Sequence, residues 1–150
     1  MRKTEQVILT NMCMVYKRNK ILVLDRKTAD WPGVTFPGGH IEPHESFVDA
    51  VIREVKEETG LTIQHPVLTG VKQFTYDSGV RYIVLFYKTN HYEGTLKSTQ
   101  EGDVFWIDKK DLHTYKLAND FDKMFEVIDD EHLSEMLYIK EKGEWIPLVK

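Results

Sequence analysis

The chain has very little cysteine. Cys13 is the only one among 150 residues, so an internal disulfide is excluded, and a lone thiol suits a reducing compartment. It stands in an apolar run, where we expect a buried, unreactive thiol. Long hydrophobic runs are also absent: none approaches the length of a membrane span, and Val7–Leu9 is too short for the core of a signal peptide. We therefore expect a cytoplasmic protein without a membrane partner.

Basic charge is scarce as well. Lysine and arginine total 20 against 24 aspartates and glutamates, the net charge is −4, and no basic stripe is present. Duplex nucleic acid is therefore a poor candidate partner. A hydrophobic content of 41% with 11% aromatics is typical of a packed core, and no repeat or linker divides the chain. We expect a single domain over residues 1–150, as a monomer or a homodimer.

Apolar and β-branched runs predict a chain made mostly of strands. The expected strands are Val7–Tyr16, Ile21–Asp25, Val34–Phe36, Leu61–Ile63, Val67–Tyr76, Val80–Thr89, Gly94–Leu96, Val104–Ile107 and a closing hairpin of Leu137–Ile139 with Trp145–Ile146. The expected helical segments, besides a central helix, are Asp108–His113, Asn119–Asp129 and Asp130–Leu137. Strands surrounding a central and a C-terminal helix indicate an α+β layered fold.

The central helix is predicted over Phe47–Thr59. Ser46 followed by Asp49 is typical of a helix N-terminus, and Gly60 stands where a helix C-terminus favours a left-handed residue. Its apolar arc consists of Phe47, Val48, Val51, Ile52 and Val55.

Three glutamates share one face of this helix. Glu54, Glu57 and Glu58 are spaced i, i+3 and i+4, so neighbouring pairs repel one another by about 0.2–0.5 kcal/mol each. A solvated acidic face is the simpler explanation of such a run. Clustered oxygen ligands with little counter-charge instead suit Mg²⁺ or Mn²⁺, and without metal at least one of these acids should titrate high.

The spacing around this helix resembles the Nudix box. Gly39, five residues, Glu45, seven residues and then Arg53–Leu61 match it at every defined position, and Trp31–His40 resembles the strand that enters the box. The resemblance implies the Nudix fold, an α/β/α sandwich with a central mixed β-sheet. It also implies a MutT-like pyrophosphohydrolase that requires divalent cations, with a nucleoside diphosphate linked to a further moiety as its substrate.

The resemblance also implies roles for particular residues. Those that it places in the metal site or in catalysis are Gly38, Glu45, Arg53, Glu54, Glu57, Glu58 and Glu101. Gly38 would contribute its carbonyl, and Glu45 would pair with Arg53 to brace the loop. Glu54 or Glu101 is favoured as the acceptor of the proton from water, with Glu58 next.

Substrate contacts follow from the same resemblance. Arg26, at the end of the second strand, would hold a phosphate with its planar guanidinium. The pair Gly38–Gly39 would let the main chain approach a ligand closely. Among the strand aromatics, Tyr82, Phe86 and Tyr87 are candidates for base stacking, although such residues more often belong to the core.

One residue bears on the choice of base. Asn119 resembles the asparagine that reads the base in MutT-like enzymes. Oxidation of guanine at C8 places a proton on N7, so a carboxamide that donates to O6 and accepts from N7 fits the oxidised base. A helix N-cap is the alternative role for Asn119.

We therefore predict a metal-dependent diphosphohydrolase that converts oxidised purine nucleotides such as 8-oxo-dGTP to monophosphate and pyrophosphate, a nucleotide-pool step in DNA repair. The alternative substrates are a dinucleoside polyphosphate, with Tyr76 as a weak signal, ADP-ribose, for which Asp77 replaces the usual proline, and a capped or triphosphorylated RNA end. A non-catalytic nucleotide-sensing Nudix domain is the alternative of another class, although no acid of the box is missing.

Overall fold

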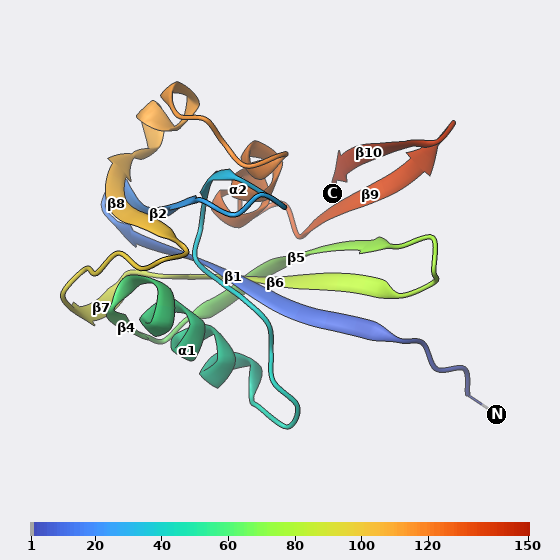
Figure 1. Ribbon diagram of the computed structural model, residues 1–150, viewed down its shortest axis with the longest axis horizontal. Coiled ribbons are helices and arrows are strands. Elements are labelled where there is room, and N and C mark those ends of the chain that lie inside the picture. The colour runs from blue at the N-terminus through green and yellow to red at the C-terminus, as the bar shows by residue number, and fades with distance from the viewer. Residues whose placement is uncertain (1) are drawn as a thin grey trace.

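A computed structural model describes residues 2–150 (Figure 1). The strands are β1 (Val7–Lys17), β2 (Lys20–Arg26), β3 (Gly33–Thr35), β4 (Leu61–Gln64), β5 (Val67–Thr75), β6 (Arg81–Thr89), β7 (His91–Gly94), β8 (Gly102–Asp108), β9 (Glu135–Glu141) and β10 (Glu144–Val149). The helices are α1 (Phe47–Thr59), the 3₁₀ helix η1 (Lys109–Thr114) and α2 (Phe121–Asp129). None of the helices in residues 2–150 is long and apolar enough to cross a membrane.

The main sheet is mixed. Its order is β10-β9-β5-β6-β1-β2-β3, with β8 also paired to β2, while β4 and β7 form a separate pair. Strand β1 runs parallel to β6 from Val7 to Val15 but pairs with β2 only at Tyr16 and Lys17. The two strands therefore diverge from their hairpin, and the edge of β1 is left to residues 37–41, which pair with it through Asn11, Cys13 and Leu9.

Both faces of the central strands are buried, and their side chains alternate between two apolar clusters. On β1, Met12 and Met14 join the cluster that contains α2, whereas Cys13 and Val15 join the cluster that contains α1. The helices α1 and α2 lie on opposite sides of the sheet (Figure 1), so the expected α/β/α arrangement is confirmed. The buried location expected for Cys13 is confirmed as well, and burial raises the pKa of its thiol.

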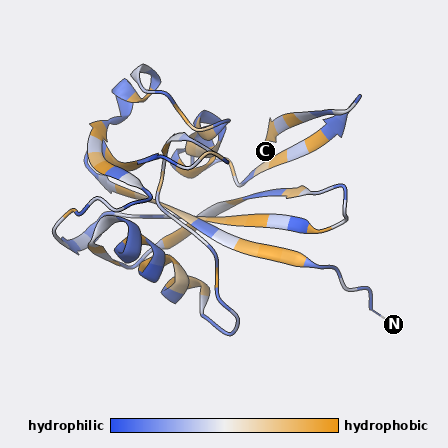
Figure 2. Ribbon diagram, in the orientation of Figure 1, coloured by the Kyte–Doolittle hydropathy of each residue, from blue (hydrophilic) through white to orange (hydrophobic). Residues whose placement is uncertain are grey.

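Helix α1 begins and ends as the sequence predicts. The Ser46 hydroxyl accepts a hydrogen bond from the Asp49 amide at 3.0 Å, and Gly60 is left-handed with φ 83°. Figure 2 shows its hydrophilic outer side. The apolar arc of α1 is narrower than predicted: Val51 and Val55 are buried and Ile52 packs against the same core cluster, but Phe47 and Val48 are exposed.

After α2 the prediction of a helix over Asp130–Leu137 is wrong. Residues 130–134 form a turn, and β9 begins at Glu135. The Glu135 backbone exchanges hydrogen bonds with Lys150, and β9 then pairs with both β10 and β5. These long-range strand pairings outweigh the local helical preference of the segment.

Two element boundaries also differ from the prediction. Helix α2 begins at Phe121 rather than at Asn119, because Asp120 takes the left-handed conformation with φ 58°. The strand expected over Gly94–Leu96 instead ends at Gly94, since β7 is set by its pairing with β4 over His91–Gly94. The hairpin between β5 and β6 is confirmed and is closed by the Tyr76 amide on the Val80 carbonyl at 2.9 Å.

Candidate active site

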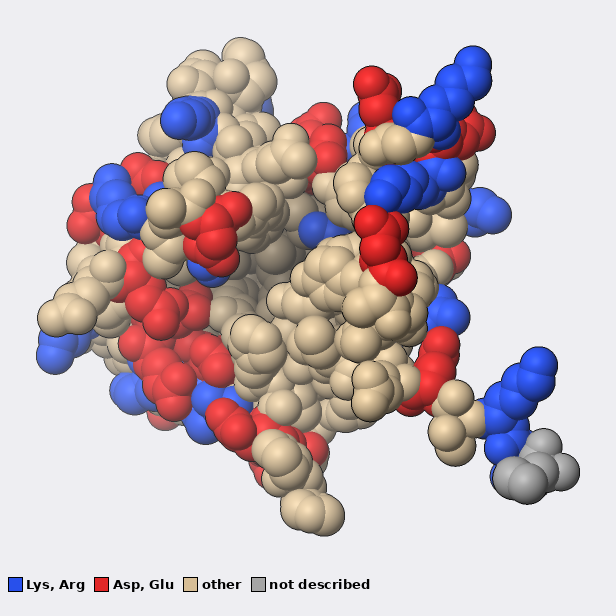
Figure 3. Space-filling model, turned by 45° about the vertical axis from the view of Figure 1, so that its right-hand side comes forward, with Lys and Arg blue, Asp and Glu red and all other residues tan. Residues whose placement is uncertain are grey.

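A cavity of about 640 Å³ opens beside β1 and is bounded by α1, β5 and the loop that follows β2. Its volume is in the range of small-molecule sites. Figure 3 shows the hollow, with acidic side chains gathered beside it. One end is acidic and contains Glu54, Glu58 and Glu101, whereas the other is lined by aromatic rings, a lysine and a methionine. The aromatic end consists of Trp31, Phe74, Tyr76, Tyr82, Lys72 and Met124.

The glycine pair connects β1 to α1. The Gly39 carbonyl accepts from the Asn11 amide at 2.9 Å, while the Gly38 amide faces the other way and donates to Glu58 Oε2 at 3.2 Å. The glycine turn therefore joins β1 to Glu58 of α1.

Neither glycine has room for a side chain. A Cβ on Gly38 would lie 2.1 Å from the Asn11 carbonyl oxygen, and one on Gly39 would lie 2.4 Å from the carboxylate of Glu54. The main chain at this turn is therefore packed directly against β1 on one side and against an acid of α1 on the other.

The acids differ in environment. Glu58 is buried, and its pKa is raised to about 9, first by burial and then by a hydrogen bond with Glu101, against the opposing Gly38 amide. Burial also raises the pKa of Glu54, with Arg53 opposing it. The expectation that one acid of this group titrates high is confirmed. Glu57 is different: its side chain is 57% exposed and does not line the cavity.

Arg53 joins the loop to the acids. Its Nε donates to Glu45 Oε2 at 2.7 Å and its Nη2 donates to Glu45 Oε1 at 2.9 Å, so the predicted pair is confirmed in bidentate form. This contact lowers the pKa of Glu45 to about 2. The same guanidinium reaches Glu54 at 2.9 Å, Glu57 at 3.4 Å and the His40 carbonyl at 3.0 Å. It thereby fixes the loop against the helix.

The donor set suits a hard divalent cation. Glu54, Glu58 and Glu101 line one cavity beside Gly38, and burial raises the pKa of the first two because their charge lacks sufficient compensation. Within residues 2–150, however, no three acidic, histidine or cysteine side chains converge closely enough to hold a metal. The carboxylates of Glu54 and Glu57 are instead both engaged by Arg53.

Of the residues predicted to contact substrate, Arg26 lines the cavity and Asn119 does not. Arg26 lines the cavity, where its guanidinium donates to the Trp31 carbonyl at 3.1 Å and to Thr28 Oγ1 at 2.9 Å. Asn119 is exposed and outside the lining, although its carbonyl accepts from the Trp31 ring at 3.3 Å. The helix N-cap position, the alternative role of Asn119, is occupied by Asp120.

The three aromatic candidates on β6 separate by face. Tyr82 lines the cavity, so it remains a candidate for stacking on a base. Phe86 and Tyr87 are buried in the two core clusters, on opposite faces of the sheet.

Sequence reasoning missed Asn11 and Lys72, which both line the cavity. Asn11 accepts from the Gly39 amide through Oδ1 at 3.2 Å, and its buried Nδ2 has no hydrogen-bond partner among residues 2–150. For Asn11 the signal is a polar side chain in the middle of an otherwise apolar strand, because it costs free energy unless something pairs with it.

Comparison with known proteins agrees with this geometry. The NUDIX domain model matches residues 9–129. The chain is 32% identical over 111 residues to the Nudix hydrolase YvcI of Bacillus subtilis, covering 71% of this chain and 69% of YvcI. It is 34% identical over 85 residues to an 8-oxo-dGTP diphosphatase of Escherichia coli, covering 54% of this chain and 64% of that protein.

A solved structure extends the likeness to almost the whole chain. The MutT protein of Bacillus halodurans superposes with a TM-score of 0.77 at 25% identity and covers 95% of this chain and 97% of its own. The box residues Gly39, Glu45 and Arg53–Leu61 lie within the matched domain, around the acidic end of the cavity. The protein therefore belongs to the Nudix hydrolase family, whose members are pyrophosphohydrolases acting on phosphorus-containing anhydrides.

Proposed function

We propose that this protein is a metal-dependent diphosphohydrolase of nucleoside triphosphates, with oxidised purine nucleotides such as 8-oxo-dGTP as its substrates. The observation that carries the proposal is the polarity of one cavity, with carboxylates at one end and aromatic rings at the other. A nucleotide has the same polarity. Its phosphates would lie at the acidic end beside divalent cations, and its base among the rings.

The residues that would hold Mg²⁺ or Mn²⁺ are Glu54, Glu57, Glu58, Glu101 and the carbonyl of Gly38. Bound cations would supply water of lowered pKa and would neutralise phosphate oxygens. Of the five, Glu57 is the least suitably placed to bind a cation, because its carboxylate is exposed and paired with Arg53. Nudix hydrolases generally need divalent cations, which supports the assignment.

The side chains of the protein would accept the proton, position the acids and contact a phosphate. The oxygen of water forms a bond to phosphorus, the anhydride bond breaks, and pyrophosphate leaves the nucleoside monophosphate. The proton from water goes to a carboxylate of the acidic end, for which Glu54 and Glu101 are favoured, with Glu58 next. Arg53 and Glu45 hold α1 and its acids in position, and Arg26 is placed to contact a phosphate once it is released from its own loop.

The choice of oxidised guanine has two supports. The 8-oxo-dGTP diphosphatase of Escherichia coli is among the relatives. Asn119 lies next to the aromatic end, because its backbone carbonyl accepts a hydrogen bond from the ring of Trp31. A base lying beside Trp31 would then receive a hydrogen bond at O6 from the Asn119 carboxamide, which would accept from the proton on N7.

A substrate panel tests the proposal. Loss of substrate and formation of the nucleotide products with Mg²⁺ are measured by chromatography for 8-oxo-dGTP, dGTP, ADP-ribose, diadenosine tetraphosphate and an RNA with a 5′-triphosphate. We expect kcat/KM for 8-oxo-dGTP to exceed that for dGTP by about tenfold or more, equivalent to about 1.4 kcal/mol of discrimination. Faster hydrolysis of ADP-ribose or of the dinucleotide would overturn the substrate assignment. Binding without turnover of any member would indicate a nucleotide sensor.

A further inference from the structure

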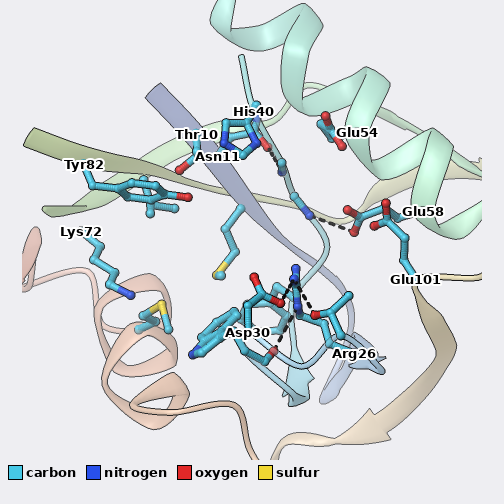
Figure 4. A pocket seen from close by; sticks show the side chains of 18 of the residues that line it. Thr10, Asn11, Arg26, Asp30, His40, Glu54, Glu58, Lys72, Tyr82 and Glu101 are labelled. Atoms are coloured by element: carbon cyan, nitrogen blue, oxygen red, sulfur yellow. Dashed lines mark hydrogen bonds and ion pairs between the residues drawn. The ribbon is translucent and has the colours of Figure 1, made fainter. Parts of the chain in front are cut away.

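The aromatic end of the cavity contains a lysine surrounded by rings. Lys72 extends from β5, and its Nζ lies 5.6 Å from the centroid of Trp31, 5.9 Å from that of Phe74 and 5.2 Å from that of Tyr138. These rings come from the loop after β2, from β5 and from β9. In Figure 4, Lys72 and Tyr82 lie on the opposite side of the cavity from Glu58 and Glu101. The lysine is thus remote from the acidic end.

The Lys72 ammonium has no hydrogen-bond acceptor in the described part of the chain. Among residues 2–150, no hydrogen bond or ion pair engages its Nζ, and the charge that acts on it most directly, Asp120, accepts a hydrogen bond from the Tyr138 hydroxyl instead. Burial lowers the pKa of Lys72 to about 8, with Asp120 opposing. Rings attract the charge but do not take up its N–H donors. The cavity therefore contains a cation whose hydrogen-bond donors are free.

A donor-only group beside a stacking platform selects among planar bases. Lysine can donate but cannot accept, so it pairs with the O6 and N7 acceptors of a 6-oxopurine. Adenine carries an amino group in place of O6, and that group would face the ammonium donor to donor. A base seated against Trp31 and Tyr82 would present one edge toward Lys72.

We propose that Lys72 is a specificity-determining residue of this enzyme, and that its ammonium donates to the exocyclic oxygen of a 6-oxopurine base. The proposal rests on the proposed function insofar as the base lies at the aromatic end. It adds a discrimination between guanine-type and adenine-type bases that does not depend on oxidation at C8, because O6 is present in guanine and in oxidised guanine. Lys72 acts in binding and has no part in the proton transfers.

Binding to the metal-free protein tests this without turnover. Affinities for dGMP and dAMP are measured by tryptophan fluorescence or calorimetry in chelator, for the natural chain and for Lys72→Met. We expect the natural chain to prefer dGMP by about tenfold or more, and Lys72→Met to reduce that preference to within about twofold through weaker dGMP binding. Lys140→Met is the matched control: Lys140 also lies over a ring, Trp145 at 5.2 Å, but it pairs with Asp77 outside the cavity.

The pH dependence gives a second readout. In the natural chain the preference for dGMP should decline as pH rises from 7 toward 8.5, because the ammonium loses its proton near its pKa of about 8. The Lys72→Met preference should stay flat, and any titration of the ligand itself would appear in both proteins. A Lys72→Met preference that declines with pH as steeply as that of the natural chain would overturn the proposal.

The outcomes separate this inference from the proposed function. A Lys72→Met protein that melts normally yet retains the full preference, or that loses dGMP and dAMP equally, refutes the role of Lys72. If one of these two results is obtained but 8-oxo-dGTP is hydrolysed, the proposed function is supported and only the role of Lys72 fails. If no nucleoside triphosphate is hydrolysed but the dGMP preference depends on Lys72, the base site is supported and the proposed reaction fails.

Discussion

The Gly38 amide donates to the carboxylate of Glu58 at 3.2 Å, across twenty residues of sequence. This bond ties the glycine turn, which is itself paired to β1, to the last turn of α1. The same bond opposes the rise that burial causes in the pKa of Glu58. The turn and the acid therefore form one structural unit.

Alanine at the two glycines should have different effects. Gly38→Ala forces its Cβ against the backbone oxygen of Asn11, which cannot move without β1, so we expect a loss of about 2–4 kcal/mol of stability. Gly39→Ala meets only the side chain of Glu54, so the acid turns away. Activity should fall by about a hundredfold or more with a small change in stability. Thermal melting and pyrophosphate release measure the two effects, and equal stability losses would contradict the contrast.

Removal of Arg53 should disable the site. Arg53→Ala frees Glu45 and leaves the acids of α1 without a counter-charge, so we expect kcat to fall about 10–100-fold or more and the Mg²⁺ requirement to rise. Arg81→Ala is the control, because Arg81 also grips a carboxylate twice, that of Glu5, but outside the cavity. Comparable activity of the two variants in a Mg²⁺ titration would show that Arg53 has no positioning role.

The metal-free protein should lose stability as pH rises. The pKa of Glu58 is raised from 4.5 to about 9, so between these values the folded chain holds a proton that the unfolded chain has released. Each step up in pH then favours unfolding. We expect the thermal midpoint in chelator to fall by several degrees between about pH 5 and pH 9, and Glu58→Gln to remove most of that slope.

Glu57→Gln provides the comparison for that slope. Glu57 is 57% exposed and lies on the same helix, so its replacement should leave the pH slope unchanged. Addition of Mg²⁺ at pH 8 should raise the midpoint of the natural chain, since a cation replaces the proton on the crowded acids. An identical slope in Glu58→Gln and in the natural chain would rule out Glu58 as the titrating group.

Asn119 should affect oxidised and normal guanine unequally. Asn119→Ala keeps the carbonyl that holds Trp31 but removes the carboxamide. We expect kcat/KM for 8-oxo-dGTP to fall about tenfold or more while that for dGTP changes little, because only the oxidised base has a proton on N7. Asn90→Ala, at another exposed asparagine, serves as control. Equal losses for both substrates would remove Asn119 from base recognition.

Local signals made the acidic end predictable. The caps of α1 involve residues within a few positions of the helix, and the pairing of Glu45 with Arg53 was implied by the resemblance to the Nudix box. The Nudix resemblance and the mixed sheet between two helical layers were likewise predictable and are confirmed. Each of these features depends on short-range pattern or on a motif that spans one loop and one helix.

Long-range contacts were not predictable in the same way. Residues 130–137 have a helical composition, yet β9 begins at Glu135 because β5 and β10 each pair with it. Lys72 reads as an ordinary strand lysine until the rings of Trp31 and Tyr138, from distant parts of the chain, are placed around it. Strand β1 pairs with β2 only near their hairpin and with the glycine turn further along, and no local sequence pattern predicts this change of partner.

The alternation of β1 between two cores constrains how this enzyme can change. The acidic end is built on α1, on the glycine turn beside β1 and on the loop that carries Glu101, and the side chains of β1 and α1 next to it belong to both core clusters. The aromatic end is built on β5, on the hairpin to β6 and on the loop after β2, whose lining side chains are at most partly buried, with Met124 of α2 buried beneath them. New nucleobase preferences should therefore arise by substitution in these peripheral segments, while the hydrolytic machinery tolerates almost none, so that a single scaffold can acquire many substrates for one reaction.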